Sequence, residues 1–138
     1  MPPTKKVKKQ EFEPWVYKDK EITGSSQFPK NSIGFIYYIF NTRTKKGYYG
    51  RKTVFSTKGK ITKELPWLNY HGSNKLLQSE VKAGDKCIRT ILCFCKTKAE
   101  MTLRESEAII CNGALEDENT YNMWVMCRIY KKNLINIK

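Results

Sequence analysis

Residues 33–50 read IGFIYYIFNTRTKKGYYG, and this stretch decides the fold. The part over residues 33–41 is rich in β-branched and aromatic side chains, which predicts a buried strand. A polar turn with a glycine near its end follows at residues 42–47. A second strand is expected to begin at Tyr48. The two strands together predict an antiparallel hairpin that carries Tyr37 and Tyr48 near each other.

The segments on either side of this hairpin have less regular patterns. Residues 11–32 place aromatic side chains between glycine and proline breakers, so we expect an irregular lead-in with one short strand that packs on the domain. Residues 51–66 are basic and predict an irregular loop. Residues 1–10 are expected to be a disordered basic arm, and residues 131–138 a basic tail. One domain over residues 33–130 remains.

Two helices are predicted in the second half of the chain. Ser73 is placed to cap a helix over residues 74–82. The side chains expected to face inward from that helix are Leu76, Leu77 and Val81. Thr97 and Glu100 form the pattern of a capping box, so a second helix is expected to run from there to about Cys111.

Two further strands complete the predicted topology. Residues 87–95 alternate in a way that is typical of a central strand, and residues 123–129 predict a last strand. The order of elements is therefore strand, strand, helix, strand, helix and a late strand. This order is typical of an α+β domain with one small sheet and helices packed on it.

The composition points to a nucleic acid as the partner. The 138 residues suit a single domain. The chain has 26 basic and 13 acidic residues, and a net charge of +13 favours a polyanionic partner. No apolar run is long enough to span a membrane and the first residues do not resemble a secretory signal, so we expect a soluble, intracellular protein. The five cysteines are expected to be reduced and buried.

Cations are concentrated around the predicted hairpin. A phenol beside cations loses its proton more easily, so Tyr37 or Tyr48 would be able to orient or deprotonate an attacking water. Positive charge also stabilises the negative charge that grows on phosphoryl oxygens during phosphodiester cleavage. Arg51 and Lys52 directly follow the hairpin. Contacts with nucleic acid are predicted for Lys45, Lys46, Lys58, Lys60, Lys63 and Lys75.

Four other polar residues are candidates for the same site. His71, the only histidine, titrates near neutral pH and can act as a base or as an acid. Glu105 and Glu107 are candidate Mg²⁺ ligands on the second predicted helix, and the helical phase does not separate them. Asn122 lies before the last predicted strand, where its amide can hold the geometry of the site.

These pieces resemble one family when they are taken in order. The segments Phe35–Tyr37 and Tyr48–Gly50 resemble the paired motifs of the GIY-YIG nucleases. Three later segments resemble the free-standing Seg-type homing endonucleases of phages. These segments are residues 67–73, 95–101 and 121–122. The resemblance extends from about Phe28 to Ile129.

The resemblance implies a fold and a set of roles. The family fold is a small three-stranded antiparallel sheet flanked by helices, here with an N-terminal extension. Tyr37 and Tyr48 match the two motif tyrosines, and Asn122 matches the late asparagine. Glu105 matches the metal-binding glutamate in one alignment, and Glu107 matches it in another, so both stay open with Glu105 preferred.

This chain departs from the family pattern at several positions. Phe35 stands where the first motif has glycine, although Gly34 is adjacent. The arginine expected after the second tyrosine falls at Lys58, so Arg51 or Lys52 is expected to supply the cation. His71 matches a position where family members carry histidine or tyrosine.

The resemblance also implies an activity. We expect an endonuclease that cuts double-stranded DNA with Mg²⁺ or Mn²⁺, either of homing type or directed at host or competitor DNA. It would work in the cytoplasm of a bacterial host, without contact with a membrane, and a homodimer on DNA is possible. Two alternatives are a catalytically inactive module that binds nucleic acid and a basic inhibitor that binds a partner protein. The first would bind DNA without metal and never cut it.

Overall fold

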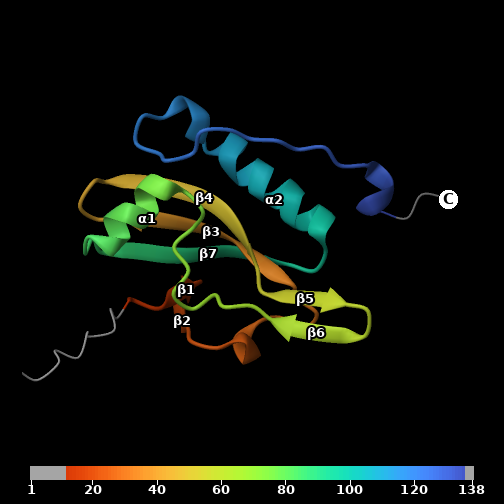
Figure 1. Ribbon diagram of the computed structural model, residues 1–138. Helices are drawn as coiled ribbons and strands as arrows, with labels where there is room; N and C mark the ends of the chain where they lie inside the picture. Colours follow the sequence, from red (N-terminus) through yellow and green to blue (C-terminus); the bar gives the residue numbers. More distant parts are fainter. Residues whose placement is uncertain (1–11, 136–138) are drawn as a thin grey trace, which may run out of the picture.

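A five-stranded mixed sheet forms the centre of the computed structural model, which describes residues 12–135 (Figure 1). The strands of this sheet are β1 (Trp15–Tyr17), β2 (Lys20–Ile22), β3 (Gly34–Asn41), β4 (Lys46–Thr53) and β7 (Cys87–Cys95). Their order across the sheet is β2-β1-β7-β3-β4, and β5 (Phe55–Lys58) and β6 (Ile61–Glu64) form a separate hairpin. The helices are α1 (Lys75–Lys82) and α2 (Lys98–Cys111), with short 3-10 turns η1 (Ser25–Gln27), η2 (Ala114–Glu116) and η3 (Lys131–Asn133).

The hairpin predicted from residues 33–50 is confirmed. β3 and β4 are antiparallel, and Tyr37 lies opposite Gly50 while Asn41 lies opposite Lys46. β7 pairs with the other side of β3, also antiparallel. These three strands are the sheet that the resemblance implied.

The expectation of a sheet with only three strands is wrong. β1 runs parallel to β7, with Val16 opposite Thr90, and β2 pairs with β1. The lead-in therefore contributes two short strands rather than one. The physical reason is burial: Trp15 is fully buried, with its ring 4.9 Å from that of Phe35 and stacked on Tyr37 at 5.6 Å. This packing brings the lead-in to the edge of β7, whose backbone groups would otherwise lack partners.

Alternating side chains of the sheet face two different layers. Phe35, Tyr37 and Ile39 belong to the larger core, which also contains Leu77 and Val81 of α1. Ile36 points to the other face, where it packs with Met101 of α2. α2 therefore covers one face of the sheet, while α1 covers the other (Figure 1).

The guanidinium of Arg89 holds the lead-in and the segment before α1 against β7. Arg89 is almost fully buried, and the Cζ atom of its guanidinium lies 4.7 Å from the centroid of the Trp15 ring. It donates hydrogen bonds to the carbonyl oxygens of Glu13 (2.6 Å), Leu68 (2.6 Å) and Tyr70 (3.0 Å). A single side chain thus joins three segments that are distant in the sequence.

Both predicted helices are present, with differences at α1. Asn74, not Ser73, caps α1: the Leu77 backbone N–H donates to the Asn74 side chain at 3.0 Å. Leu77 faces inward as expected, but Leu76 is exposed because it points about 100° away from Leu77 around the helix. The Thr97 cap of α2 is confirmed by a bond of 3.1 Å from the Glu100 backbone N–H.

Two other expectations were wrong. The segment 51–66 is not an irregular loop, because β4 continues to Thr53 and the β5–β6 hairpin follows it. Residues 123–129 form no strand. The outer edge of β4 is already met by the chain just before that segment, so these residues have no backbone partner there. They pass along α2 instead (Figure 1).

Other expectations fall partly or wholly outside the described residues. The proposed arm at residues 1–10 and the last three residues of the tail belong to this group. Cys87 and Cys95 are buried as expected, whereas Cys111 and Cys127 are exposed; all five cysteines are free thiols. Among residues 12–135, no helix is long and apolar enough to cross a membrane.

Candidate functional site

A cavity of about 430 Å³ lies against the outer strand of the sheet, β4. The start of α1, the middle of α2 and the chain after residue 120 form its other walls. The polar residues that line it are Tyr37, Tyr48, Tyr49, Arg51, Ser73, Asn74, Lys75, Glu105, Tyr121 and Asn122. It therefore contains Tyr37, Tyr48, Arg51 and Glu105, together with Lys75 and Asn122, from five separate parts of the sequence.

The free edge of β4 is covered by three different partners, and this arrangement positions the cavity. The backbone of Gly47 bonds to the carbonyl of Asn119 and to the N–H of Tyr121, at 2.9 and 2.8 Å. Tyr49 exchanges two bonds with the Asn122 side chain, at 2.9 and 2.8 Å.

The third partner at this edge is Glu105. Its carboxylate accepts a hydrogen bond from the backbone of Arg51. Alternate residues of an edge strand present their backbone groups outward, so Gly47, Tyr49 and Arg51 are the positions that need partners. Covering the edge in this way draws Asn122 and Glu105 to the same strand.

Tyr37 reaches the cavity across a glycine. Its ring lies directly over Gly50, its partner on β4, so that a Cβ at this position would collide with the phenol. Gly72 adopts a φ of +88°, and a Cβ there would come within 3.2 Å of the Tyr37 hydroxyl. Both glycines leave room for the buried phenol.

The surroundings of Tyr37 do not favour loss of its proton. Burial raises the pKa of Tyr37 well above its ordinary value, and the neighbouring Tyr70, Tyr48 and Glu105 raise it further. The expectation that nearby cations make this phenol easier to ionise is therefore wrong, because burial and acidic neighbours outweigh them. Tyr37 stays protonated and can donate a hydrogen bond.

Two more tyrosines surround Tyr37. The Tyr48 hydroxyl is 3.0 Å from that of Ser73, and its ring centroid is 6.1 Å from that of Tyr37. Tyr70 stacks on Tyr37 with centroids 5.8 Å apart, and the Lys52 ammonium lies 4.7 Å from the Tyr70 ring centroid. Lys52 is thus placed behind this aromatic group and does not line the cavity.

The structure separates the two candidate glutamates. Glu105 lines the cavity, and burial raises the pKa of its carboxyl while the charge of Arg51 opposes that rise. Glu107 forms an ion pair of 2.8 Å with Arg104 on the exposed side of α2. Side chains two positions apart on a helix point about 200° away from each other. Only one of Glu105 and Glu107 can therefore face the cavity.

The predicted cations fall into two groups. Arg51 and Lys75 line the cavity, and the guanidinium of Arg51 donates to the Thr102 hydroxyl at 2.6 Å. The remaining lysines lie outside it. Lys45 and Lys46 lie at the β3–β4 turn, and Lys58, Lys60 and Lys63 lie on the β5–β6 hairpin.

His71 lies outside the cavity. Its ring packs against Phe12 with centroids 4.4 Å apart, and its Nδ1 is 2.8 Å from the Asn69 carbonyl oxygen. Burial, followed by the charge of Arg89, lowers the pKa of His71 to about 4. The imidazole is therefore neutral at physiological pH, and it does not line the cavity that contains Tyr37.

Some residues of the site were missed by the sequence analysis. Tyr70 directly precedes His71, which was aligned with the family position that carries histidine or tyrosine. A shift of one residue in that alignment would have identified Tyr70 instead. Ser73 and Thr102 orient Tyr48 and Arg51, and no pattern in the sequence indicates these pairs.

The apolar wall of the cavity was also missed. It is formed by Ile109 and by residues 123–126, of which Trp124 is 69% exposed. The sequence pattern of residues 123–129 predicted a strand instead. The position of this wall follows from the bonds of Asn122 to β4, which connect segments far apart in the chain.

The cavity combines a protonated phenol, a guanidinium and one carboxylate. Such a set can bind a phosphate group and hold a hard cation against it. Within residues 12–135, no cluster of three or more histidine, cysteine, aspartate or glutamate side chains could hold a metal ion without help. A single carboxylate that shares a cation with substrate phosphates is a common arrangement for Mg²⁺.

One family model matches the chain. It is described as the GIY-YIG domain of putative endonuclease segE, and it covers residues 15–127. The match includes the β3–β4 hairpin, all of α2 and Asn122. No curated protein and no solved structure matches the chain.

Proposed function

Because the chain belongs to the GIY-YIG family described for putative endonuclease segE, we propose that it hydrolyses phosphodiester bonds of double-stranded DNA at the cavity beside β4. One observation carries this proposal: Tyr37, Arg51 and Glu105 reach a single cavity from β3, β4 and α2. The net charge of +13 supports a polyanionic substrate.

The chain's own groups would bind and orient the scissile phosphate. Tyr37 is held protonated by burial, so it donates a hydrogen bond to a phosphoryl oxygen. Arg51 is oriented by Thr102 and stabilises the negative charge that grows in the transition state. A water molecule attacks phosphorus, the bond to the leaving oxygen breaks, and that oxygen takes up a proton.

Tyr48 is the residue best placed to orient the attacking water. Its hydroxyl is at the cavity and is held by Ser73. We propose that it accepts a hydrogen bond from the water. Tyr70 would complete the group by stacking on Tyr37, and we assign His71 a structural part because its neutral ring faces Arg89.

Glu105 is the carboxylate that fits a divalent cation. Among residues 12–135 it is the one acidic side chain that lines the cavity, and burial raises its pKa although the charge of Arg51 opposes that rise. Mg²⁺ or Mn²⁺ bound there would supply positive charge next to the phosphate. Glu107 is paired with Arg104 and is not needed for this role.

Asn122 and Lys75 have supporting roles in this proposal. Asn122 holds the chain after η2 to Tyr49, which keeps the cavity walls in place. Lys75, at the start of α1, is exposed and lines the cavity, where it can contact a neighbouring phosphate. By family resemblance we also propose a homing-type role or cleavage of host or competitor DNA within bacteria.

The test is a cleavage assay on supercoiled plasmid with three proteins: wild type, Glu105→Gln and Glu107→Gln. We expect wild type to nick the plasmid with Mg²⁺ or Mn²⁺ and not with EDTA. Glu105→Gln should lose activity by about 10–100-fold or more, since a ligand of the cation is removed. Glu107→Gln is the matched control, and it should cut like wild type.

Two outcomes would contradict the proposal. If the wild type binds DNA without metal and never cuts it with Mg²⁺ or Mn²⁺, the chain is a binding module. If Glu107→Gln loses activity and Glu105→Gln keeps it, the cavity beside β4 is not the site of hydrolysis. Circular dichroism of all three proteins establishes that each one is folded.

A further inference from the structure

The β5–β6 hairpin projects from the sheet and is exposed on both of its strands. Every residue of β6 is exposed, as are Ser56, Thr57 and Lys58 of β5. Its turn is Gly59-Lys60, with Gly59 at a φ of +62°, and a Cβ on that glycine would meet no atom within 4 Å. A two-stranded hairpin is marginally stable in water by itself, and the exposed residues beyond the base of this one are open to an external partner.

The two faces of this hairpin differ in character. Successive residues of a strand point to opposite sides, so Phe55 and Glu64 share one face. That face turns to the body of the protein: the Phe55 ring lies 6.4 Å from Phe28, and the Glu64 carboxylate accepts a bond of 3.0 Å from the Trp67 indole. The face that points away from the body carries Ser56, Lys58, Ile61 and Lys63.

The base of the hairpin is fixed to the strand that carries Arg51. Only Val54 separates β4 from β5, and Val54 is fully buried. The backbone N–H groups of Val54 and Phe55 donate to the Ile33 carbonyl oxygen at 2.8 and 2.9 Å. The hairpin therefore has a defined direction relative to the cavity, and it is not a freely hinged loop.

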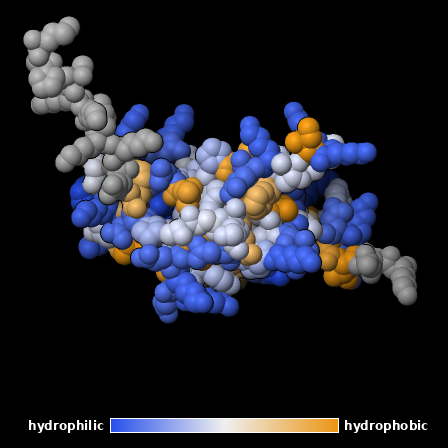
Figure 2. Space-filling view, turned by 90° about the horizontal axis from the view of Figure 1, so that it is seen from below, coloured by the Kyte–Doolittle hydropathy of each residue, from blue (hydrophilic) through white to orange (hydrophobic). Residues whose placement is uncertain are grey.

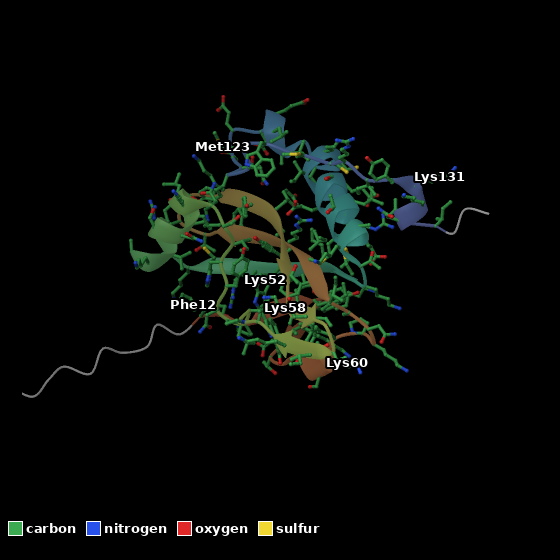
Figure 3. All side chains as sticks on the ribbon, turned by 45° about the vertical axis from the view of Figure 1, so that its right-hand side comes forward. Phe12, Lys52, Lys58, Lys60, Met123 and Lys131 are labelled. Atoms are coloured by element: carbon green, nitrogen blue, oxygen red, sulfur yellow. The ribbon has the colours of Figure 1, made fainter. Side chains whose placement is uncertain are left out.

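Positive charge continues along this path from the sheet to the turn. Lys52, Lys58 and Lys60 follow one another from the end of β4 to the end of the hairpin (Figure 3). The side of the molecule on which the hairpin lies is mostly hydrophilic, with scattered hydrophobic residues (Figure 2). Such a surface suits a polyanion better than an apolar protein partner.

We propose that the β5–β6 hairpin enters a groove of the DNA duplex and contacts base pairs on one side of the cut. This inference rests on the proposed function, because the duplex is placed by the phosphate in the cavity. The major groove is wide enough for a two-stranded ribbon. Lys58 and Lys63 contact the phosphates that line the groove, while Lys60 and Ile61 at the turn reach base edges.

The length of the strand limits which base pairs are reached. Gly59 lies eight positions after Arg51, and an extended strand rises about 3.3 Å per residue, so the turn lies at most ~26 Å from the Arg51 backbone. A duplex rises about 3.4 Å per base pair. Base preference is therefore expected within about eight base pairs of the cut, on one side.

The test removes the side chains of the hairpin end and keeps its backbone. The variant carries Lys58→Thr, Lys60→Gly and Ile61→Thr. Its turn then consists of two glycines, and the opposite positions 58 and 61 hold a pair of threonines. This pair resembles the existing Thr57–Thr62 pair, whose hydroxyls are 3.0 Å apart. The control carries Lys82→Thr and Lys86→Thr, two exposed lysines at the other end of the sheet (Figure 1). Both variants lose two positive charges.

Two measurements are made on a pool of duplexes with random sequence. Base preference is read from the cut ends and, independently of cutting, from the duplexes retained in a binding selection. Affinity is measured against salt concentration. The hairpin variant should lose the preference, still cut DNA, and show a log–log salt slope shallower by roughly 1, since the phosphate contact of Lys58 is lost. The control should keep both the preference and the slope.

The outcomes separate this inference from the proposed function. If wild type shows no base preference, or if the hairpin variant keeps it, the hairpin does not read DNA. If wild type selects sequences in the binding assay but never cuts, the nuclease proposal fails. The binding selection with the hairpin variant then still decides whether the hairpin reads DNA. The double variant Lys58→Ala and Lys63→Ala repeats the salt measurement with the turn unchanged, and an unaltered slope there also overturns the inference.

Discussion

His71 shows how the surroundings of one side chain determine its chemistry. A histidine near a predicted helix start is a natural candidate for a general base. In the folded protein it is 8% exposed, packs on Phe12 and lies close to Arg89. These contacts favour the neutral ring, so the residue is better suited to packing than to accepting a proton at neutral pH.

A stability measurement tests this environment. The pKa of His71 is lowered to about 4 by burial and then by Arg89, whereas in the unfolded chain it is about 6.5. The unfolded state therefore binds more protons between these values, and the free energy of unfolding falls as pH drops from ~6.5 to ~4. The loss is on the order of 3 kcal/mol. Urea denaturation of wild type and His71→Asn from pH 7 to pH 4 measures it.

His71→Asn should flatten this pH dependence, because asparagine has no proton to gain. The amide can still donate to the Asn69 carbonyl oxygen, so the local hydrogen bond is preserved. An equally steep fall in the variant would mean that other groups cause the effect. Loss of cleavage in a folded His71→Asn protein at pH 7 would instead restore the residue as a candidate base.

Glu105 changes the free energy of unfolding with pH in the opposite direction to His71. Burial raises the pKa of its carboxyl, so the folded state prefers the neutral form. Stability is then full at low pH and is lost as pH rises through the raised pKa. Without metal, Glu105→Gln should therefore melt a few degrees higher than wild type at pH 7.5 and at nearly the same temperature at pH 3.5.

Addition of Mg²⁺ or Mn²⁺ should reverse this order. A cation that binds the folded state stabilises it, so the melting temperature of wild type should rise with metal concentration. Glu105→Gln should respond little, and Glu107→Gln should respond like wild type. Equal responses in all three proteins would exclude Glu105 as the metal ligand, whatever the activity assay shows.

At the scale of elements, the outer edge of β4 determines the shape of the site. Three of its outward backbone positions are met by the backbone near Thr120, by the Asn122 amide and by the Glu105 carboxylate. An edge strand left open would expose unpaired groups to other chains. Here the partners of the edge are also walls of the cavity.

Asn122→Ala tests this link between edge and cavity. It removes two bonds of 2.9 and 2.8 Å to Tyr49, so we expect a loss of about 1–3 kcal/mol in the free energy of unfolding. The amide hydrogen of Tyr49 should exchange faster with solvent. Asn112→Ala is the matched control, because the Asn112 side chain bonds only to the Ala108 carbonyl at the exposed end of α2.

Equal losses of stability in the two variants would show that Asn122 has no special part in holding the chain to β4. An unchanged exchange rate at Tyr49 would lead to the same conclusion. If Asn122→Ala loses cleavage and keeps its stability, the side chain contacts the substrate directly. The two measurements thus distinguish a brace from a substrate contact.

At the scale of the whole molecule, the proposed function makes one cavity and a large positive charge responsible for how DNA is cut. Within residues 12–135, the cavity beside β4 is lined by one carboxylate, Glu105, which we propose as the metal ligand. One such site hydrolyses one strand at a time. We expect the charge of +13 to hold the protein on DNA between events, and this attraction should weaken with salt.

Supercoiled plasmid should therefore be converted to the nicked circle before linear DNA accumulates. A time course on agarose gels at several protein concentrations measures the order of the two products. If linear DNA forms directly, with a rate that rises as the square of protein concentration, two copies act together on the duplex. Raising salt should slow the first nick for wild type by weakening binding.

Much of the architecture followed from the sequence by itself. The β3–β4 hairpin was predicted by a run of β-branched and aromatic residues with a polar turn, and α2 by its capping pattern. These features depend on neighbours in the chain, which is why local patterns predict them. Local patterns failed for residues 123–129, because a strand also needs a free edge to pair with.

The tertiary structure alone decided which side chains meet. It turned Glu105 toward the cavity and Glu107 toward Arg104, placed Tyr70 rather than His71 beside Tyr37, and added β1 and β2 to the sheet. In each case the direction of a side chain depends on segments far away in the sequence. The sequence determined the central hairpin, β7, both helices and the candidate residues, whereas packing of distant segments determined which of these residues share one cavity.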